Sequence, residues 1–482
     1  MHDERDNGAD PKSGLSRRGM LQAGLIAAAG VGVGGFTSAA SASASAGGHR
    51  PDRWRHRHLR KPGSRPYPNL PAGTDTIPQI KHIVILMQEN HSYDNRLGML
   101  RRCDADGFRL GFNGLPLNTN PYANGDIQHA FHMPTTCQNN KPSQEWTQSH
   151  IQFDHGRNNG FVISNSGPVA MGYWDRADQP FYYSMADIFP IGDRYFCSVL
   201  GQTYPNRRYL ISATSIGQID DTTPALSDYP ANGTIFDKVQ DAGLSWKDYY
   251  SPSTDSPYPT IALYPKLYLE NAGKRAVPIA DFFTDAAAGT LPDVSLVEPN
   301  YDTQSEEDPQ NIVVGEQFAA KVINAAMSGP GWANTVLIWT YDEHGGYYDH
   351  VPPPPALAPD DIPPDTKAIS STTLPYNGFH QYGFRVPMAV ISPFSRPRHV
   401  SHQVMDHTSI SALIETKWNL PAMTYRDANA WPMLDMLDLR RPHFLTPPKL
   451  AQPLLDTDPG ALACSTTGPG VIPPPGSVTP PQ

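Results

Sequence analysis

Cysteine is scarce in this chain of 482 residues, which contains four. None of the four has the spacing of metal ligands, so a cysteine-ligated zinc site is not expected. Four cysteines allow at most two disulfides, and Cys103 with Cys137 is the pair we expect if one forms.

Charged residues are also few, and positive charge is in deficit. Only 17% of the residues are charged, and 37 basic against 47 acidic residues give a formal net charge of -10. This acidic balance argues against nucleic acid as a substrate or partner. With 39% apolar residues, the chain can bury a substantial core. The 50 prolines and 39 glycines indicate many long, stiff loops.

Long apolar runs are lacking near the start of the chain. The stretch from Ala23 to Phe36 is shorter than the ~20 residues that a membrane span needs, which disfavours an anchor. The pair Arg17-Arg18 precedes this stretch, and small residues follow it from Thr37 to Ala46. This layout predicts a twin-arginine signal peptide over residues 1–46. We therefore expect a secreted protein that the twin-arginine export machinery carries in the folded state.

The rest of the chain divides by composition. Residues 47–75 form a basic linker rich in Pro, Arg and His, which we expect to be disordered. One large domain is expected over residues 76–445, and it includes an amphipathic helix from Glu316 to Met327. A tail rich in Pro, Ser, Thr and Gly follows over residues 446–482 and is also expected to be disordered.

Two apolar runs stop abruptly at acidic residues. The run from His82 to Met87 leads into Gln88-Glu89-Asn90, and the run from Thr335 to Tyr341 leads into Asp342-Glu343. Both runs are typical of buried strands whose carboxyl ends open into a polar site. Four oxygen-bearing side chains at one rim suit a hard divalent cation. The alternative is that these residues only cap helices and form salt bridges.

Four segments resemble the signature segments of a known family, in the family's order. They are Glu89-Asn90-His91-Ser92-Tyr93-Asp94, the run from Gly201 to Arg207, the run from Asp342 to Pro353, and Asp406-His407-Thr408-Ser409. Together they resemble the bacterial phosphoesterase family that contains phospholipases C and related acid phosphatases. The resemblance extends from about Thr76 to Pro421, and the domain at 76–445 is then the catalytic domain.

The resemblance implies an alkaline-phosphatase-like α/β fold, with a central, mostly parallel sheet flanked by helices and with long inserted loops. It also implies that Glu89, Asn90, Asp342 and Glu343 hold one divalent metal ion, whose identity the sequence does not give. Thr203 would be the nucleophile that takes up the phosphoryl group, which requires a cation or base to lower the cost of its alkoxide. On its own, Thr203 also suits a turn before Tyr204-Pro205.

Other candidate residues follow from the same segments. Asn206 and Arg207 are candidates for hydrogen bonds to phosphate or for structural ones, and a guanidinium suits a bidentate contact. His350 is expected to support the site from behind, and His407 to support it or to transfer a proton. His344 occupies a variable position of its segment. His150 and His155 lie in a segment that we expect to face the substrate.

Two positions depart from the family's usual pattern. Gln144, in Pro142-Ser143-Gln144-Glu145-Trp146, stands where a histidine is expected, and Asp308 stands where the family often has a second one. The amide of Gln144 can still donate hydrogen bonds to an oxyanion, whereas an ionised Asp308 cannot. Asp308 could instead accept a proton, coordinate a cation or act as a protonated acid.

The sequence therefore predicts a secreted, metal-dependent phosphoesterase, most consistent with a phospholipase C that works through a phosphothreonine intermediate. The alternative within enzymes is a broad-specificity phosphomonoesterase related to acid phosphatases. The alternative that is not an enzyme is a non-catalytic exported binding protein of the same fold. The expected partners are a phospholipid or a small phosphate ester and, in transient contact, a membrane surface.

Overall fold

The computed structural model describes residues 59–102, 104–138, 140–254, 257–367, 369, 378–455, 464 and 472–477. The chain separates into two units, Met1–Pro51 and Asp52–Gln482, and the described residues all belong to the second. The predicted signal peptide, the first part of the predicted linker and Cys103 lie outside the described residues. No helix within the described ranges is long and apolar enough to cross a membrane.

An eight-stranded sheet forms the centre of the fold, with the order β12-β6-β11-β10-β1-β9-β7-β8. β11 runs antiparallel to β10 and β6, and the other neighbours are parallel. The strands of this sheet are β1 (His82–Gln88), β6 (Ile191–Gly192), β7 (Trp246–Ser251), β8 (Ala276–Pro278), β9 (Val294–Asn300), β10 (Thr335–Tyr341), β11 (Met388–Ile391) and β12 (Val400–Ser401). Two small sheets pair β2 (Thr119–Pro121) with β3 (Ile127–His129) and β4 (Phe131–His132) with β5 (Gly172–Tyr173).

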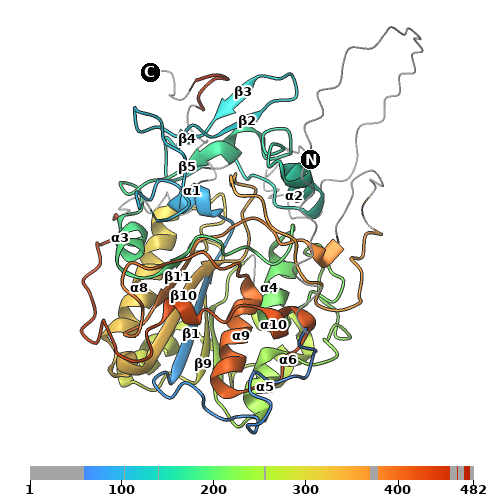
Figure 1. Ribbon diagram of the computed structural model, residues 1–482, viewed down its shortest axis with the longest axis vertical. Coiled ribbons are helices and arrows are strands. Elements are labelled where there is room, and N and C mark those ends of the chain that lie inside the picture. The colour runs from blue at the N-terminus through green and yellow to red at the C-terminus, as the bar shows by residue number, and fades with distance from the viewer. Residues whose placement is uncertain are drawn as a thin grey trace, which may run out of the picture. The chain divides into compact units, whose positions relative to one another are not determined.

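Helices cover both faces of the large sheet, with α8 on one side and α9 on the other (Figure 1). The helices are α1 (Tyr93–Leu97), α2 (Trp146–Phe153), α3 (Pro180–Ile188), α4 (Thr203–Ser212), α5 (Ile235–Asp241), α6 (Pro265–Asn271), α7 (Ile279–Ala288), α8 (Ile312–Ser328), α9 (His407–Trp418) and α10 (Tyr425–Asn429). The predicted α/β class, with a mostly parallel sheet between helices, is confirmed.

The central strands and α8 follow directly from the sequence. β1 and β10 are largely apolar and are buried along almost their whole length, as expected for strands covered on both faces. α8 begins after Asn311, whose side chain accepts a hydrogen bond from Val313 N, and it contains the predicted helix from Glu316 to Met327. The predicted apolar face of that helix is buried against the sheet.

The end of the predicted linker is ordered, in contrast to the expectation. Arg60 N donates to Asn429 Oδ1 at 3.0 Å, and Tyr67 N donates to Asn419 Oδ1 at 2.9 Å. Thr76 N reaches Lys417 O at 2.8 Å. The folded part of the chain therefore begins well before residue 76, because polar backbone groups of this proline-rich segment pair with the ends of α9 and α10.

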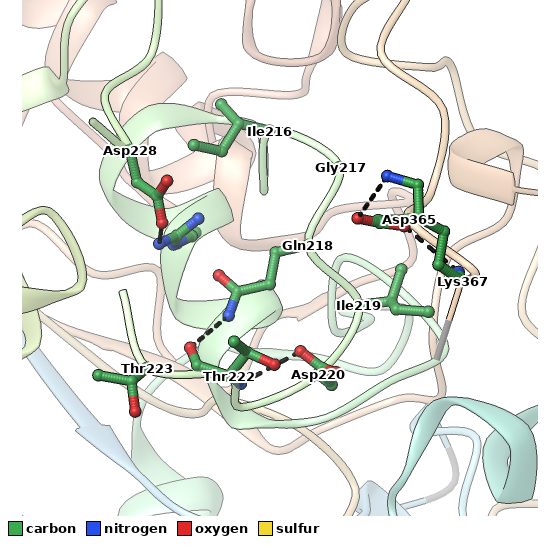
Figure 2. Close-up of a pocket in the computed structure, with 11 residues that line it drawn as sticks. Ile216, Gly217, Gln218, Ile219, Asp220, Thr222, Thr223, Asp228, Asp365 and Lys367 are labelled. Carbon is green, nitrogen blue, oxygen red and sulfur yellow. Dashed lines mark hydrogen bonds and ion pairs between the residues drawn. The ribbon is translucent and has the colours of Figure 1, made fainter. Parts of the chain in front are cut away.

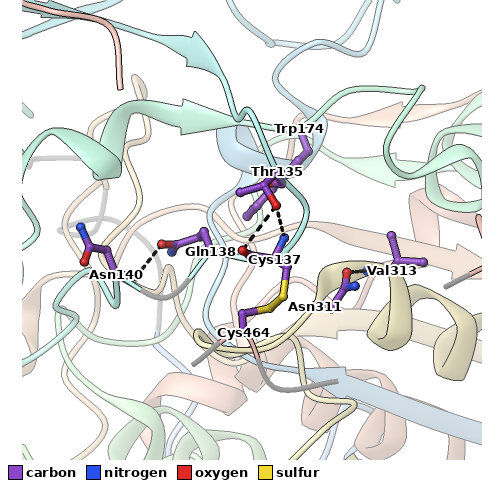
Figure 3. Close-up of a disulfide and its surroundings, with 8 residues drawn as sticks. All are labelled: Thr135, Cys137, Gln138, Asn140, Trp174, Asn311, Val313 and Cys464. Atoms are coloured by element: carbon purple, nitrogen blue, oxygen red, sulfur yellow. Dashed lines mark hydrogen bonds between the residues drawn. A yellow bond between two sulfur atoms is a disulfide. The ribbon is translucent and has the colours of Figure 1, made fainter. Parts of the chain in front are cut away.

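The observed disulfide joins Cys137 to Cys464, so the expected pairing of Cys103 with Cys137 is wrong (Figure 3). The two Cα atoms are 5.1 Å apart, although 327 positions separate them in the sequence. Cys464 N also donates to Pro309 O at 2.7 Å. The sequence did not indicate the observed pairing, because only the fold brings Cys464 beside the segment that contains Asp308.

The described parts of the predicted tail are held by further hydrogen bonds. Ala451 N donates to Ser184 Oγ, Gln317 Nε2 donates to Leu454 O, and Gly476 N donates to Ile127 O. These parts of the tail are therefore attached to the domain, and composition alone was a poor guide to their order.

Candidate active site

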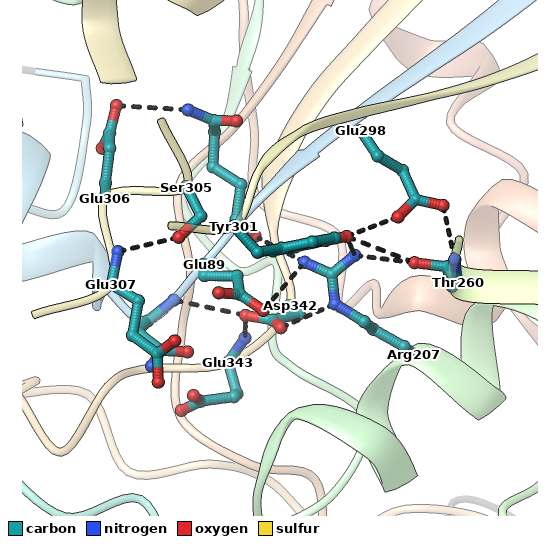
Figure 4. A network of polar contacts seen from close by, with 12 residues as sticks. Glu89, Arg207, Thr260, Glu298, Tyr301, Ser305, Glu306, Glu307, Asp342 and Glu343 are labelled. Atoms are coloured by element: carbon teal, nitrogen blue, oxygen red, sulfur yellow. Dashed lines mark hydrogen bonds and ion pairs between the residues drawn. The ribbon is translucent and has the colours of Figure 1, made fainter. Parts of the chain in front are cut away.

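The register of two parallel strands brings the predicted metal ligands together. β1 pairs with β10 from His82 opposite Thr335 to Gln88 opposite Tyr341, so the two strands end side by side. Glu89 and Asp342 are the next residues of each strand, and Asn90 N donates to Asp342 Oδ1 at 3.2 Å. Figure 4 shows the carboxylates of Glu89, Asp342 and Glu343 in one group.

Two glycines allow the loop after β10 to approach this group closely. Gly345 has φ +65°, and a Cβ atom there would lie 1.8 Å from Asn90 O. Gly346 has φ +79°, and a Cβ atom there would lie 2.5 Å from Ser143 N. Larger residues would be strained in this conformation and would clash with backbone atoms. The Gly-Gly pair therefore fixes how the loop packs against Asn90 and Ser143.

Three of the four predicted ligands have a buried oxygen without a hydrogen-bond partner among the described residues. These atoms are Glu89 Oε2, Asn90 Oδ1 and Glu343 Oε1. Burial raises the pKa of Glu89 and of Glu343, and the neighbouring carboxylates raise both further. Unsatisfied, mutually repelling carboxylate and amide oxygens fit a hard divalent cation such as Ca²⁺, Mg²⁺ or Mn²⁺. The chemistry of these donor atoms thus fits the predicted metal.

Arg207 of α4 balances part of this negative charge. Its Nε donates to Asp342 Oδ2 at 2.9 Å, and its Nη2 lies 3.5 Å from Glu89 Oε1. The buried guanidinium therefore holds two predicted metal ligands, which is a structural role rather than a contact that leaves it open to phosphate.

The other edge of the guanidinium contacts residues that the sequence reasoning missed. Arg207 Nη1 donates to Tyr301 Oη at 2.9 Å and to Thr260 Oγ1 at 3.1 Å. Tyr301 Oη donates in turn to Glu298 Oε2 at 2.6 Å. Glu298 lies near the carboxyl end of β9, which neighbours β1. The run Val294-Ser295-Leu296-Val297 that stops at Glu298 was the available signal, since it repeats the pattern of the other two strands.

Thr203 is the first residue of α4 and is almost fully buried, with 9% of its surface exposed. Asn206 holds the loop before it: its side chain accepts from Val199 N at 3.0 Å and donates to Gly201 O at 3.0 Å. Residues four apart lie on one face of a helix, so Thr203 and Arg207 share a face. The contacts of Arg207 therefore place the Thr203 face of α4 toward the carboxylate group.

A polar cavity of about 280 Å³ lies beside α4, next to the loop at 216–223 (Figure 2). Asp221 in this loop accepts a hydrogen bond from Tyr204 N at 2.8 Å, which fixes the start of α4. In the cavity lining, Asp228 pairs with Arg208, and Asp365 lies 3.5 Å from Lys367. Because these charges are paired within the protein, we assign the cavity no part in the chemistry.

His407 contacts the strand end that carries the carboxylates. Its Nε2 donates to Asp342 O at 2.6 Å, so its Nδ1 accepts from Tyr195 Oη at 2.9 Å. Burial lowers the pKa of His407 to about 4, which keeps the ring neutral. This geometry positions Asp342 and favours the supporting role over proton transfer.

His350 belongs to a separate cluster behind the loop. Its Nδ1 lies 2.7 Å from Asp94 Oδ2 and its Nε2 lies 3.3 Å from Asp106 Oδ1. Burial alone would lower its pKa, but the two carboxylates raise it to about 10. The ligand atoms of Asp94, Asp349 and His350 lie within 4.8 Å of one another. Arg385 donates to the carboxylates of Asp94 and Asp349, so the guanidinium of Arg385 already supplies positive charge to this cluster.

The candidate substrate-binding residues and His344 lie in different places. His150 is buried and bonds its own helix through Trp146 O, whereas His155 is exposed. Gln144 is buried in the segment that packs on Gly346 through Ser143. His344, in the variable position, bonds Gln152 of α2 through Nε2 at 2.7 Å. The α2 segment therefore forms one wall against the loop after β10, with His155 outside it.

Asp308 is buried close to the same loop. Its Oδ2 accepts from Tyr347 Oη at 2.6 Å, and Gln138 Nε2 donates to that same hydroxyl at 2.7 Å. Burial raises the pKa of Asp308 to about 7, although the hydrogen bond from Tyr347 opposes the shift. The neighbouring Glu307, another residue the sequence reasoning missed, forms an ion pair with Lys141.

Comparisons with known proteins found a matching family model, similar relatives and a similar solved structure. The model of the phosphoesterase family matches residues 80–421. Phospholipase C A of Mycobacterium tuberculosis is 31% identical over 436 residues, covering 80% of this chain and 82% of the relative. Non-specific phospholipase C1 of Arabidopsis thaliana is 29% identical over 389 residues, covering 73% and 69%. A solved protein of the alkaline phosphatase superfamily from Vibrio parahaemolyticus aligns over 78% of this chain and 72% of its own, with a TM-score of 0.36 and 11% identity.

The Tyr301 hydroxyl should matter for cation binding. In Tyr301→Phe, Arg207 loses the acceptor that draws it away from Glu89 and Asp342, so its charge competes more strongly with a cation. We expect Mn²⁺ affinity, measured by titration with paramagnetic resonance detection, to fall about 10-fold, as for other residues behind metal ligands. Tyr249→Phe is the matched control, because Tyr249 Oη donates to Asp285 Oδ2 at 2.6 Å in a different contact. Equal affinity in Tyr301→Phe and wild type would refute this role.

Asp308 should make stability depend on pH. The pKa of Asp308 in the folded protein, about 7, exceeds the ordinary 3.8. The contribution of Asp308 to the free energy of unfolding is therefore fully present below 3.8 and is lost as the pH rises through about 7. The side chain at this position of the variant Asp308→Asn cannot ionise. The free energy of unfolding of the variant, relative to wild type, should therefore rise by on the order of 2 kcal/mol between pH 5 and pH 8. Urea unfolding at both pH values measures this, with the exposed Asp126→Asn as control. A difference that does not change with pH would show that Asp308 is already ionised at pH 5.

Proposed function

The chain belongs to the phosphoesterase family and is a phosphoric ester hydrolase, and from this premise we propose that it is a secreted, metal-dependent phospholipase C. The observation that carries the proposal is the group at the carboxyl ends of β1 and β10. There, Glu89, Asn90 and Glu343 each offer a buried oxygen without a hydrogen-bond partner among the described residues. Relatives named phospholipase C support a phospholipid as the substrate.

Glu89, Asn90, Asp342 and Glu343 are the residues proposed to hold one divalent metal ion. When bound, such an ion would supply positive charge to an alkoxide nucleophile and to the phosphoryl oxygens. Arg207 holds Asp342 and Glu89, and His407 holds the Asp342 backbone, so the ligands are oriented in advance.

Thr203 is proposed as the nucleophile. Its Oγ1 loses its proton and forms a bond to phosphorus while the bond from phosphorus to the alcohol oxygen breaks, and the alcohol oxygen takes up one proton as it leaves, so the protons balance. For a phospholipid, that alcohol is diacylglycerol. Water then attacks the phosphothreonine, the bond to Oγ1 breaks, and the phosphorylated head group is released as Thr203 regains its proton.

Export in the folded state is part of the proposal, with Arg17-Arg18 as the recognised pair. The disulfide between Cys137 and Cys464 is compatible with a destination outside the reducing cytoplasm. We also propose that the enzyme makes transient contact with a membrane surface, since its substrate resides there.

The function is tested by the release of p-nitrophenol from two soluble esters. A phospholipase C should cleave the phosphorylcholine diester, should stop when a chelator is added, and should recover with a divalent cation. Preference for the simple phosphate monoester would favour a phosphomonoesterase instead. Turnover of neither ester by metal-loaded protein would favour a binding protein.

Replacing the proposed nucleophile gives the sharpest test of the mechanism. Thr203→Ala should keep the fold and the bound metal but lose about 10³- to 10⁶-fold in rate, because the only group proposed to bond to phosphorus is gone. Thr203→Ser should retain substantial activity. After a rapid acid quench, intact-mass spectrometry of the wild type should show an adduct with the mass of the phosphorylated head group on the peptide from Gly201 to Arg207. Near wild-type turnover by Thr203→Ala would point to direct attack by water.

A further inference from the structure

One hairpin exposes an unusual amount of apolar surface. Phe112 is fully exposed, and Leu117 and Leu110 are 62% and 37% exposed. A Cβ atom at Gly111 would lie 3.2 Å from Leu117 Cδ2, so the Leu117 side chain lies over Gly111, between Leu110 and Phe112 in the sequence. Leu110 pairs with Pro116 in an antiparallel bridge, so Leu110 lies on the face opposite to Gly111 and Leu117. The hairpin therefore exposes apolar side chains on both of its faces, and exposed apolar surface of this kind marks interaction sites. We call residues 109–117 the apolar hairpin.

The backbone of the apolar hairpin is well defined. Leu117 N donates to Arg109 O at 2.7 Å, and Gly111 N donates to Leu115 O at 2.8 Å. The turn is closed at Gly114, which has φ +77°, a conformation that favours glycine. A closed turn holds Phe112 away from the core, so its exposure follows from the fold of the hairpin.

The base of the apolar hairpin is anchored beside the candidate active site. Phe108 is buried in a cluster that includes Tyr347 and Tyr348, on the loop that follows Glu343. Asp106 contacts His350 on the same loop. The hairpin therefore leaves the domain next to the loop that shapes the metal group.

Positive charge flanks the apolar tip in a chain whose formal net charge is -10. Arg101 and Arg109 are both exposed. Arg101 Nη2 lies 3.5 Å from where a Cβ atom of Gly114 would be, so it borders the turn. An apolar tip beside exposed guanidinium groups complements a lipid surface, with acyl chains below anionic phosphates.

We propose that the apolar hairpin is the membrane-docking element of this protein, with Phe112 and Leu117 entering the lipid interface and Arg101 and Arg109 contacting lipid phosphates. The inference rests on the proposed function, since it concerns how a lipid substrate is reached. Docking through the hairpin would bring the loop after β10 close to the membrane surface. Phe112 and Leu117 would then affect turnover of lipid in a bilayer and leave turnover of a soluble ester unchanged.

The experiment compares Phe112→Ala and Leu117→Ala with Leu269→Ala. Leu269 of α6 is a matched control, because it is 67% exposed against 62% for Leu117. Binding to vesicles of phosphatidylcholine with phosphatidylglycerol is measured by sedimentation. Turnover is measured on the same vesicles and on the soluble phosphorylcholine ester of p-nitrophenol.

Phe112→Ala should weaken vesicle binding about 10-fold, the factor expected when one aromatic side chain no longer leaves water, and Leu117→Ala by a smaller factor. Vesicle turnover should fall in parallel, while turnover of the soluble ester should match wild type. Leu269→Ala should match wild type throughout. Replacing both Arg101 and Arg109 with Gln should reduce binding to vesicles that contain phosphatidylglycerol and flatten its salt dependence.

Wild-type vesicle binding by Phe112→Ala and Leu117→Ala would overturn the inference and leave the hairpin as a contact for another kind of partner. An equal loss on the soluble ester would also overturn it, because the residues would then act on the site itself. If wild type binds vesicles through Phe112 but cleaves neither substrate, the proposed function fails and the docking element stands.

Discussion

The burial of three carboxylates at the ends of two neighbouring strands is the constraint on which the site depends. Glu89, Asp342 and Glu343 repel one another where water cannot screen them, and burial raises the pKa of each. Backbone N–H groups and Arg207 stabilise Asp342, but one guanidinium does not balance three neighbouring carboxyl groups. A divalent cation carries the opposite charge, and the oxygens without partners are the atoms that would meet it. A bound cation would therefore both reduce the repulsion among these carboxylates and supply the positive charge that the proposed chemistry needs.

The fold was predictable where local pattern and long-range structure agree. Two apolar runs that end at acidic residues were enough to identify β1 and β10, and their parallel register explains why Glu89 and Asp342 lie close together. The roles of Tyr301 and Glu298, which contact the proposed metal ligands through Arg207, were not predicted. They depend on which strand lies next to β1. Sequence gives strand ends but not strand order, so the contact from Tyr301 to Arg207 became visible only with the sheet order β10-β1-β9.

The errors at the two ends of the domain share a cause. Proline-rich, polar composition predicts disorder because such segments bury little apolar surface. Residues 59–75 and the described parts of the tail are instead held by hydrogen bonds to a finished scaffold and, at Cys464, by a covalent bond. These contacts bury little apolar surface and produce no periodic pattern of apolar residues in the sequence. The raised pKa of His350 was not predictable from the sequence either, because Asp94 and Asp106, which raise it, lie far from His350 in the chain.

The departures at Gln144 and Asp308 bear on which ester suits the site. A histidine at either position could carry positive charge toward a phosphate, whereas an amide cannot and a carboxyl group adds negative charge when it ionises. Phosphate monoesters carry close to two negative charges near neutral pH, since their second pKa is about 6, and diesters carry one. An amide and a carboxyl group at these two positions offer no positive charge to a phosphate, which penalises a monoester more than a diester. Arg207 cannot make up the difference, because its guanidinium is engaged by Asp342, Glu89 and Tyr301. This charge balance is consistent with the diester substrate that we propose.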